Sequence, residues 1–425
     1  MAPPRPGPPG APGNPTRRNP VDAPSDTSGR EHQGDNGQDG DEDDDDNDET
    51  NSNYSSVSGD SLPPIRAYGH SYHGSARIYL PNDAAEDERL RVQHELYKLC
   101  LGGRLHDATL PIEKQDGGLD VEKEKNNKVT DRKGADDDSK GADDDSKDND
   151  KTKAAPEAAH SKFHILDIGS GNGLWAVEVA RRYPSASVLG IDLSSALLPK
   201  DVPPNLTFEI ADATEPWPSR QYDFIHMRNL VGGGVRDWER LAADALAHLK
   251  PGGILEFSDI RPRFYDVDPA HAELPEGETP VVGASCLEYE RLLAEATARE
   301  GVDFDPVPRV SEWLVEAGVE GLRERADWLP TTGWGNDPIM CEKGRMLSQL
   351  LDFGVEHYSI LLFGKSGREE ADTRALLARV MQESKSPKLR SYCNLTFITA
   401  RKPVAETEDD GNVSFGALWP GLMSR

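Results

Sequence analysis

The sequence of 425 residues lacks any run that approaches the roughly 18 apolar residues of a membrane helix, and it opens without the apolar core of a secretion signal. It has only four cysteines, scattered without C-x-x-C spacing or a paired histidine cluster. Neither a structural zinc site nor a disulfide framework is indicated, and we expect no bound metal. These absences predict an intracellular protein with reduced thiols and no membrane partner.

Basic residues are also scarce. The chain has 76 acidic and 48 basic side chains, which gives a formal net charge of −28. Binding to nucleic acid depends on Lys and Arg that release counterions from phosphates, and no basic face is evident here. We therefore expect no direct nucleic-acid partner.

Hydrophobic residues make up only 36% of the chain, so much of it is not expected to pack into a core. Residues 1–60, rich in Pro, Gly and acids, and residues 113–160, with two acidic repeats, are predicted to be disordered. A cap segment is predicted at 61–112 and the main folded domain at 161–402. The last residues, 403–425, are predicted to fray.

The most informative stretch begins at Phe163. An apolar run ends in Asp167, and three alternating glycines follow before helix-forming residues that begin with Leu174. Glycines let the backbone turn sharply and approach a ligand, and the free N–H groups that open a helix favour an anion. The NAD fingerprint G-x-G-x-x-G would need its third glycine at Leu174, so this spacing suits S-adenosylmethionine better.

Strand and helix patterns alternate after this loop. Strands are predicted at 163–168, 187–191, 206–210, 222–227 and 254–257, and helices at 174–182 and 238–249. Further helices are predicted at 285–299, 310–317, 338–362 and 369–382, and a last strand at 392–400 that closes the edge of the sheet. This order predicts an α/β fold with a Rossmann-like, mostly parallel, doubly wound sheet and a ligand at the C-terminal ends of the strands.

Acidic residues end the second and third strands. Asp192 stands at the end of strand two, where a carboxylate can accept both hydroxyls of a ribose. Asp212 and Ala213 follow strand three, where they can receive the amino group and ring of adenine. An isolated acid after a strand more often caps a helix, and Asp192 would also fit NAD.

These motifs resemble those of the class I S-adenosylmethionine-dependent methyltransferases. They are found at 167–173, 192, 212–213, 222–226 and 249–253. The N-terminal flank is similar to the cap of the LaeA-like methyltransferases of filamentous fungi, at 68–73, 81–83, 88–90 and 93–96.

The resemblance implies S-adenosylmethionine as cofactor, a small molecule or a protein as methyl acceptor, and a role in, or in control of, secondary metabolism and development. Some members of the family are nuclear partners of velvet-type regulators. The location of this protein, in the nucleus or in the cytoplasm, is therefore left open. The residues expected to bind the cofactor are Asp167, Gly169, Ser170, Gly171, Asn172, Gly173, Asp192, Leu193, Asp212 and Ala213.

No side chain is obligatory for catalysis, because positioning and exclusion of water supply much of the rate of methyl transfer. If the acceptor carries a proton, the candidate bases are His226, His70, Tyr72 and His73, although each histidine is more often structural. A separate group of apolar and aromatic residues on the predicted helix 338–362 could line an acceptor pocket or could simply pack in the core. These residues are Met340, Met346, Leu350, Phe353 and Tyr358.

The leading interpretation is a methyltransferase whose acceptor is unidentified, and two alternatives to it remain at this stage. The first is a regulatory binding protein that keeps the cofactor fold to assemble complexes. An NAD-dependent oxidoreductase is the second alternative, disfavoured by the glycine spacing.

Overall fold

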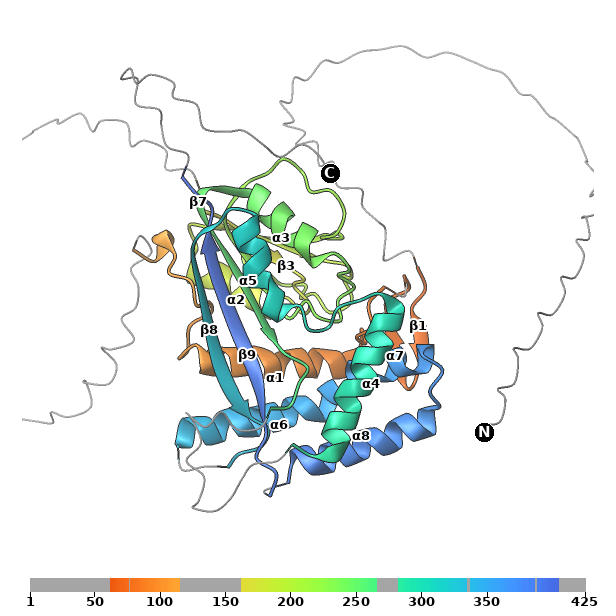
Figure 1. Cartoon of the computed structure of the whole chain (residues 1–425). Coiled ribbons are helices and arrows are strands. Elements are labelled where there is room, and N and C mark those ends of the chain that lie inside the picture. Colours follow the sequence, from red (N-terminus) through yellow and green to blue (C-terminus); the bar gives the residue numbers. More distant parts are fainter. Residues whose placement is uncertain are drawn as a thin grey trace, which may run out of the picture. The chain divides into compact units, whose positions relative to one another are not determined.

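The computed structural model describes residues 62–75, 77–114, 162–265, 282–334, 337–386 and 388–404, which Figure 1 draws in colour. All of them belong to one compact unit. The predicted disordered segment 1–60, nearly all of 113–160 and most of the tail 403–425 lie outside these residues, so the predicted domain boundaries stay predictions.

A seven-stranded sheet organises the described part. Its five parallel strands are β3 (His164–Ile168), β4 (Ser187–Asp192), β5 (Leu206–Ile210), β6 (Tyr222–Arg228) and β7 (Leu249–Ile260). Two more strands, β8 (Glu320–Pro330) and β9 (Tyr392–Arg401), complete the order β5-β4-β3-β6-β7-β9-β8, with β9 antiparallel to both neighbours. The prediction of a mostly parallel α/β sheet is confirmed.

The pleat of the strands divides the core into two layers. Side chains of one set face α2 (Leu174–Arg182), and those of the other set face α3 (Trp238–Ala247) and α5 (Val307–Glu316). The first set includes Ile165, Val188 and Phe224, and the second includes Leu166, Leu189 and Ile225. Helices therefore cover both faces of the sheet, as predicted.

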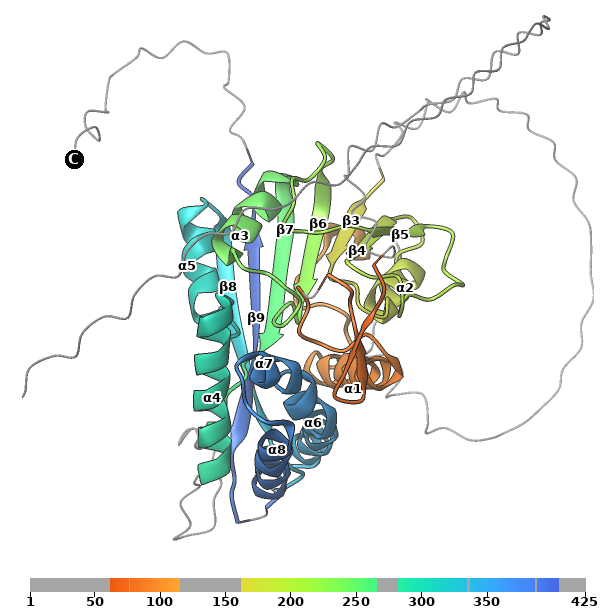
Figure 2. The same ribbon diagram turned by 90° about the vertical axis from the view of Figure 1, so that its right-hand side faces the viewer.

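The remaining helices gather at the end of the sheet where the parallel strands finish (Figures 1 and 2). They are α1 (Ala84–Cys100), α4 (Ala284–Glu300), α6 (Pro338–His357), α7 (Ile360–Lys365) and α8 (Glu370–Ser384). A short hairpin, β1 (Ile65–Ala67) with β2 (His70–Tyr72), precedes α1, and the 3-10 helix η2 (Pro111–Lys114) follows it. No helix in the described ranges is both long enough and apolar enough to cross a bilayer.

Two details of the predicted order are wrong. The strand at 392–400 does not close the sheet, because β9 lies between β7 and an edge strand, β8, that was not predicted. Most side chains of β8 are exposed or half-buried and several are charged, so its sequence lacks the apolar alternation of a strand. The helix predicted at 338–362 is two helices, α6 and α7. Ser359 lies between them as the N-cap of α7, and its carbonyl accepts the N–H of Phe363 in the first turn of that helix.

A buried carboxylate ties the cap segment to the sheet. Glu256 in β7 accepts the backbone N–H groups of Asp107 and Ala108 at 2.9 and 2.7 Å through its Oε2. Asp107 in turn accepts a hydrogen bond from Arg325 of β8 at 3.1 Å. Burial raises the pKa of Glu256 to about 7. The cap is therefore held to the sheet by polar contacts as well as by the packing of α1.

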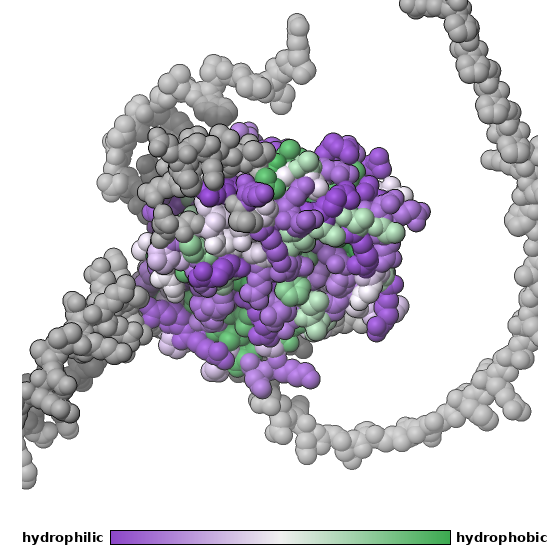
Figure 3. All heavy atoms as spheres, turned by 90° about the horizontal axis from the view of Figure 1, so that it is seen from below, coloured by the Kyte–Doolittle hydropathy of each residue, from purple (hydrophilic) through white to green (hydrophobic). Residues whose placement is uncertain are grey.

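The described surface offers no broad apolar face. Figure 3 shows one side, where hydrophobic residues form small groups between hydrophilic ones. The large hydrophobic side chains that are exposed lie on separate elements and are Leu62, Val202, Leu287, Val315, Ile339 and Val404. Single exposed side chains of this kind are normal in proteins and indicate no docking site.

Candidate active site

The glycine loop after β3 has the conformation that its sequence requires. Gly169, Gly171 and Gly173 have φ of 69°, 58° and 71°, a region that other residues rarely adopt. A Cβ at Gly169 would collide with Leu230. The N–H groups of Gly169 and Ser170 donate to the carbonyl of Ile191 at 2.9 and 3.0 Å, which fixes the loop beside β4.

This loop borders a cavity of about 1220 Å³, a volume that includes space open to solvent. The structure brings nine of the ten predicted cofactor residues to its wall, and these are Asp167, Gly169, Ser170, Gly171, Asn172, Asp192, Leu193, Asp212 and Ala213. Gly173 does not line it, because a Cβ there would point at Phe208 and Pro199 instead. The role of Gly173 is thus to let the loop pack, and the binding roles of the nine remain predictions.

Asp192 is arranged to bind a diol. Its Oδ2 accepts the N–H of Gly171 at 2.7 Å, and its Oδ1 accepts the N–H of Ser194 at 3.0 Å. A carboxylate has about four lone-pair positions, so each oxygen can still accept one hydroxyl. The two backbone bonds fix the orientation of the carboxylate beside the cavity.

Burial raises the pKa of Asp192 to about 6. Since ribose hydroxyls donate to the ionised carboxylate, we expect the affinity for S-adenosylmethionine to be constant above about pH 7 and to fall up to about tenfold per pH unit below about pH 6. Calorimetric titration between about pH 5 and 8 measures this. The matched variant Asp192→Asn should lack the step, and equal wild-type affinity at pH 5 and 7.5 would contradict the expectation.

His226, the strongest candidate base, does not line the cavity. Its Nδ1 lies 2.8 Å from Oδ1 of Asp167, and its ring stacks on Trp175 with centroids 3.6 Å apart. Burial lowers the pKa of His226 to about 4, so the ring is neutral at neutral pH and donates its Nδ1 proton to Asp167. The ring therefore orients Asp167, which leaves the second oxygen of that carboxylate for a ligand.

The other candidate bases also lie away from this cavity. Nδ1 of His70 is 3.0 Å from Asp83, the residue that caps α1, and its Nε2 is 3.7 Å from Glu356. Tyr72 is fully buried, and burial raises the pKa of its hydroxyl. His73 is held by Ser75 at 2.7 Å. None of these side chains is on the cavity wall.

Asp212 is already engaged within the protein. Arg77, which precedes α1, donates to its Oδ2, and the N–H and hydroxyl of Thr214 donate to its Oδ1 at 2.9 and 2.6 Å. Only Oδ2 has room for a further donor such as an adenine amino group. The role predicted for Asp212 therefore depends on Arg77, which the sequence patterns did not single out.

Several wall residues were missed because they come from distant elements. Arg89, Leu90 and Gln93 of α1 reach the cavity from the cap, and Arg228 and Asn229 reach it from the end of β6. Asn229 has φ of 53°, an uncommon value for a residue other than glycine. The position at the end of a parallel strand could have indicated Arg228, but no local signal indicates which face of α1 meets the sheet.

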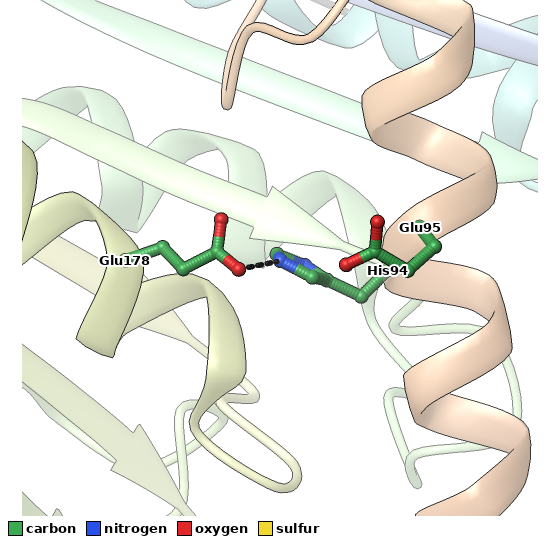
Figure 4. Close-up of side chains that lie close together, drawn as sticks. All are labelled: His94, Glu95 and Glu178. Atoms are coloured by element: carbon green, nitrogen blue, oxygen red, sulfur yellow. Dashed lines mark ion pairs between the residues drawn. The ribbon is translucent and has the colours of Figure 1, made fainter.

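Three possible metal ligands, His94, Glu95 and Glu178, lie within 4.8 Å of one another (Figure 4). Lys98 is 3.1 Å from both carboxylates, and the guanidinium of Arg228 is 3.2 Å from Nδ1 of His94. Arg only donates, so the proton of His94 is on Nε2, which faces Glu178 at 3.2 Å. A protonated nitrogen cannot ligate a metal. The cluster fits an ion-pair network, and the expected absence of a metal stays a prediction.

Comparison with known proteins decides the class of the domain. Residues 130–318 match the family model described as a methyltransferase domain. The chain contains a methyltransferase domain. This match confirms the resemblance to the S-adenosylmethionine-dependent methyltransferases and S-adenosylmethionine as their shared cofactor, which the glycine loop and Asp192 fit.

Two relatives extend the similarity of the methyltransferase domain to the cap. Methyltransferase pytC of Aspergillus terreus is 28% identical over 352 residues, which cover 82% of this chain and 90% of the relative. The secondary metabolism regulator LAE1 of Cochliobolus heterostrophus is 28% identical over 346 residues, which cover 79% of this chain and 94% of the relative.

Proposed function

We propose that the cavity beside the glycine loop binds S-adenosylmethionine and that the protein transfers its methyl group to an acceptor. The observation that carries this proposal is the geometry of Asp192, whose two oxygens are fixed by backbone N–H groups and retain acceptor capacity next to the loop. Asp212 and Ala213 would hold the adenine. Asp167 and Arg228 would hold the amino and carboxylate groups of the methionine part.

The residues of this chain contribute by orientation and shielding. Transfer of a methyl group is an in-line displacement, so a fixed cofactor and a fixed nucleophile supply much of the rate. His226 and Trp175 fix Asp167, while Leu90 covers the loop, since a Cβ at Gly171 would lie 3.2 Å from it. The cap helix α1 therefore helps to exclude water from the reacting atoms.

The names of the relatives support a role in, or in control of, fungal secondary metabolism. One is named a methyltransferase and the other a regulator of secondary metabolism. We infer that this chain also acts in, or controls, secondary metabolism, with a small molecule or a protein as methyl acceptor.

A regulatory binding protein is the second candidate function, favoured by the relatives named as regulators. In this version the domain keeps the cofactor fold to assemble complexes, with velvet-type regulatory proteins as partners. Its place of action, nucleus or cytoplasm, would follow from the partner.

Incubation of the full chain with tritiated S-adenosylmethionine and fractions of a fungal extract separates the two functions. The enzyme is expected to label a protein or metabolite fraction, and Asp192→Ala should reduce that label at least about tenfold. Asp201→Ala is the matched control, because Asp201 is an exposed acid that follows β4 and does not line the cavity, and this variant should label as the wild type does. Absence of label while partners still co-purify would favour the binding protein.

A further inference from the structure

A second cavity adjoins the proposed cofactor cavity. Its volume is about 620 Å³ on the same measure. Arg89 and Gln93 of α1 line both cavities, so these two residues lie where the cavities meet. Both residues are at least nine-tenths buried. A molecule in the second cavity would thus approach the cofactor in the first cavity beside these two polar side chains.

The order of the strands places this cavity where a methyl acceptor is needed. The residues proposed to hold adenine, ribose and methionine follow β5, β4, and then β3 and β6, in the order of the sheet. The second cavity lies at the next strands in this order, because its lining residues Val231, Ile260 and Cys393 follow β6, end β7 and lie on β9. The cavity therefore lies beside the methionine end, next to the group to be transferred.

A glycine in α6 leaves space in this cavity. Gly354 lies inside the helix, where glycine costs about 1 kcal/mol relative to alanine. Its φ is not positive, and a Cβ there would meet only Tyr358, at 3.9 Å. By contrast, a Cβ at Gly344 in the same helix would collide with Thr332. Neither backbone conformation nor close packing requires the glycine at 354, whereas room for a ligand does explain it.

The charged side chains on the wall are all basic. Besides Arg89, the wall has Arg261 and Arg263, which share one acid, Asp305, at 2.6 and 2.8 Å. The hydrogen bonds of Arg89 to Glu86 and Gln93 use three of its five N–H groups. The other two can donate to an oxygen, whereas a guanidinium cannot accept a hydrogen bond from an ammonium group.

The rest of the wall is apolar. It includes Val231, Phe264, Leu347, Leu350, Val355 and Tyr358. Of the residues suggested by the sequence for an acceptor pocket, Leu350 and Tyr358 are on this wall, while Met340, Met346 and Phe353 are not. An apolar body with an acidic oxygen matches these surroundings.

We propose that this second cavity is the acceptor site and that the acceptor is a small, largely apolar organic acid. This inference rests on the proposed function. The ionised acceptor oxygen lies beside Arg89 and donates an electron pair to the methyl carbon as the bond from carbon to sulfur breaks. The bonding pair goes to the sulfonium, which becomes a neutral thioether, and the acceptor becomes a methyl ester or ether. No proton moves, so no base is required at this site.

The experiment uses the full chain with S-adenosylhomocysteine bound and two probes of matched shape, 3-phenylpropionate and 3-phenylpropylamine. Affinities are measured by NMR titration. The acid should bind at least about tenfold more tightly than the amine. Equal or tighter binding of the amine overturns the class of acceptor, and failure of both probes to bind overturns the site.

Variants of α6 locate the binding. Gly354→Phe fills the cavity and should weaken binding of the acid at least about tenfold, while Gln349→Phe on the exposed side of α6 should leave it unchanged. Gly354→Leu gives the same test if the larger substitution does not fold. Unchanged binding in a folded Gly354 variant overturns the proposal.

The affinity for S-adenosylmethionine is measured in parallel and should stay within about twofold in all three variants. If the wild type binds the cofactor but neither probe, only the acceptor site is contradicted. If the wild type does not bind the cofactor at all, the proposed function itself fails.

Discussion

Asp192→Ala should lower the affinity for S-adenosylmethionine about 100-fold or more. The substitution removes two hydrogen bonds from the ribose to a charged acceptor, each worth about 1.5 to 3 kcal/mol, and about 1.4 kcal/mol corresponds to tenfold. It also frees the N–H of Gly171, which Oδ2 of Asp192 accepts at 2.7 Å. Calorimetric titration of the folded variant measures the loss.

Asp201→Ala is the control for this prediction. Asp201 is exposed and also follows β4, so its loss changes the charge by the same amount without changing the cavity wall. We expect its affinity to stay within about twofold of the wild type. Retained affinity in Asp192→Ala would mean that the cofactor binds elsewhere.

Glu86→Ala should lower the free energy of unfolding by about 3 to 5 kcal/mol, because it leaves a buried guanidinium without its partner. Glu86 accepts two hydrogen bonds from Arg89, at 2.8 and 2.6 Å, and a third from His357 of α6 at 2.7 Å. Although burial opposes ionisation, the charge of Arg89 keeps the pKa of Glu86 below its ordinary value. Unfolding in urea, followed by circular dichroism, measures the change.

Glu95→Ala provides the comparison within the same helix. Glu95 is exposed and pairs with Lys98 at 3.1 Å, so its removal should cost at most about 1 kcal/mol. If Glu86→Ala costs no more than Glu95→Ala, the buried ion pair does not hold α1 on α6. The double variant Glu86→Leu with Arg89→Leu should recover part of the loss, since no unpaired charge then remains.

The centre of the cavity was predictable because its signals are local. Gly169 and Gly171 need positive φ, and Asp192 ends a strand, so short patterns indicate both the turn and the position of the carboxylate. The register of β3 against β4 then brings them together, with Ile168 opposite Ile191.

The walls contributed by other elements were not predictable in the same way. Arg89 reaches both cavities from a cap helix that is separated from β3 by more than 60 residues of sequence, and its role depends on how α1 packs on α6. Arg77 meets Asp212 across 135 positions. The edge strand β8 was missed for a related reason, since its pairing with β9 rather than an apolar pattern makes it a strand.

Calorimetric titration of the full chain with S-adenosylmethionine and, separately, with NAD tests the central claim most directly. The account predicts saturable binding of S-adenosylmethionine with one site per chain, which Asp192→Ala weakens, and no measurable binding of NAD. Tight binding of NAD without binding of S-adenosylmethionine would contradict it.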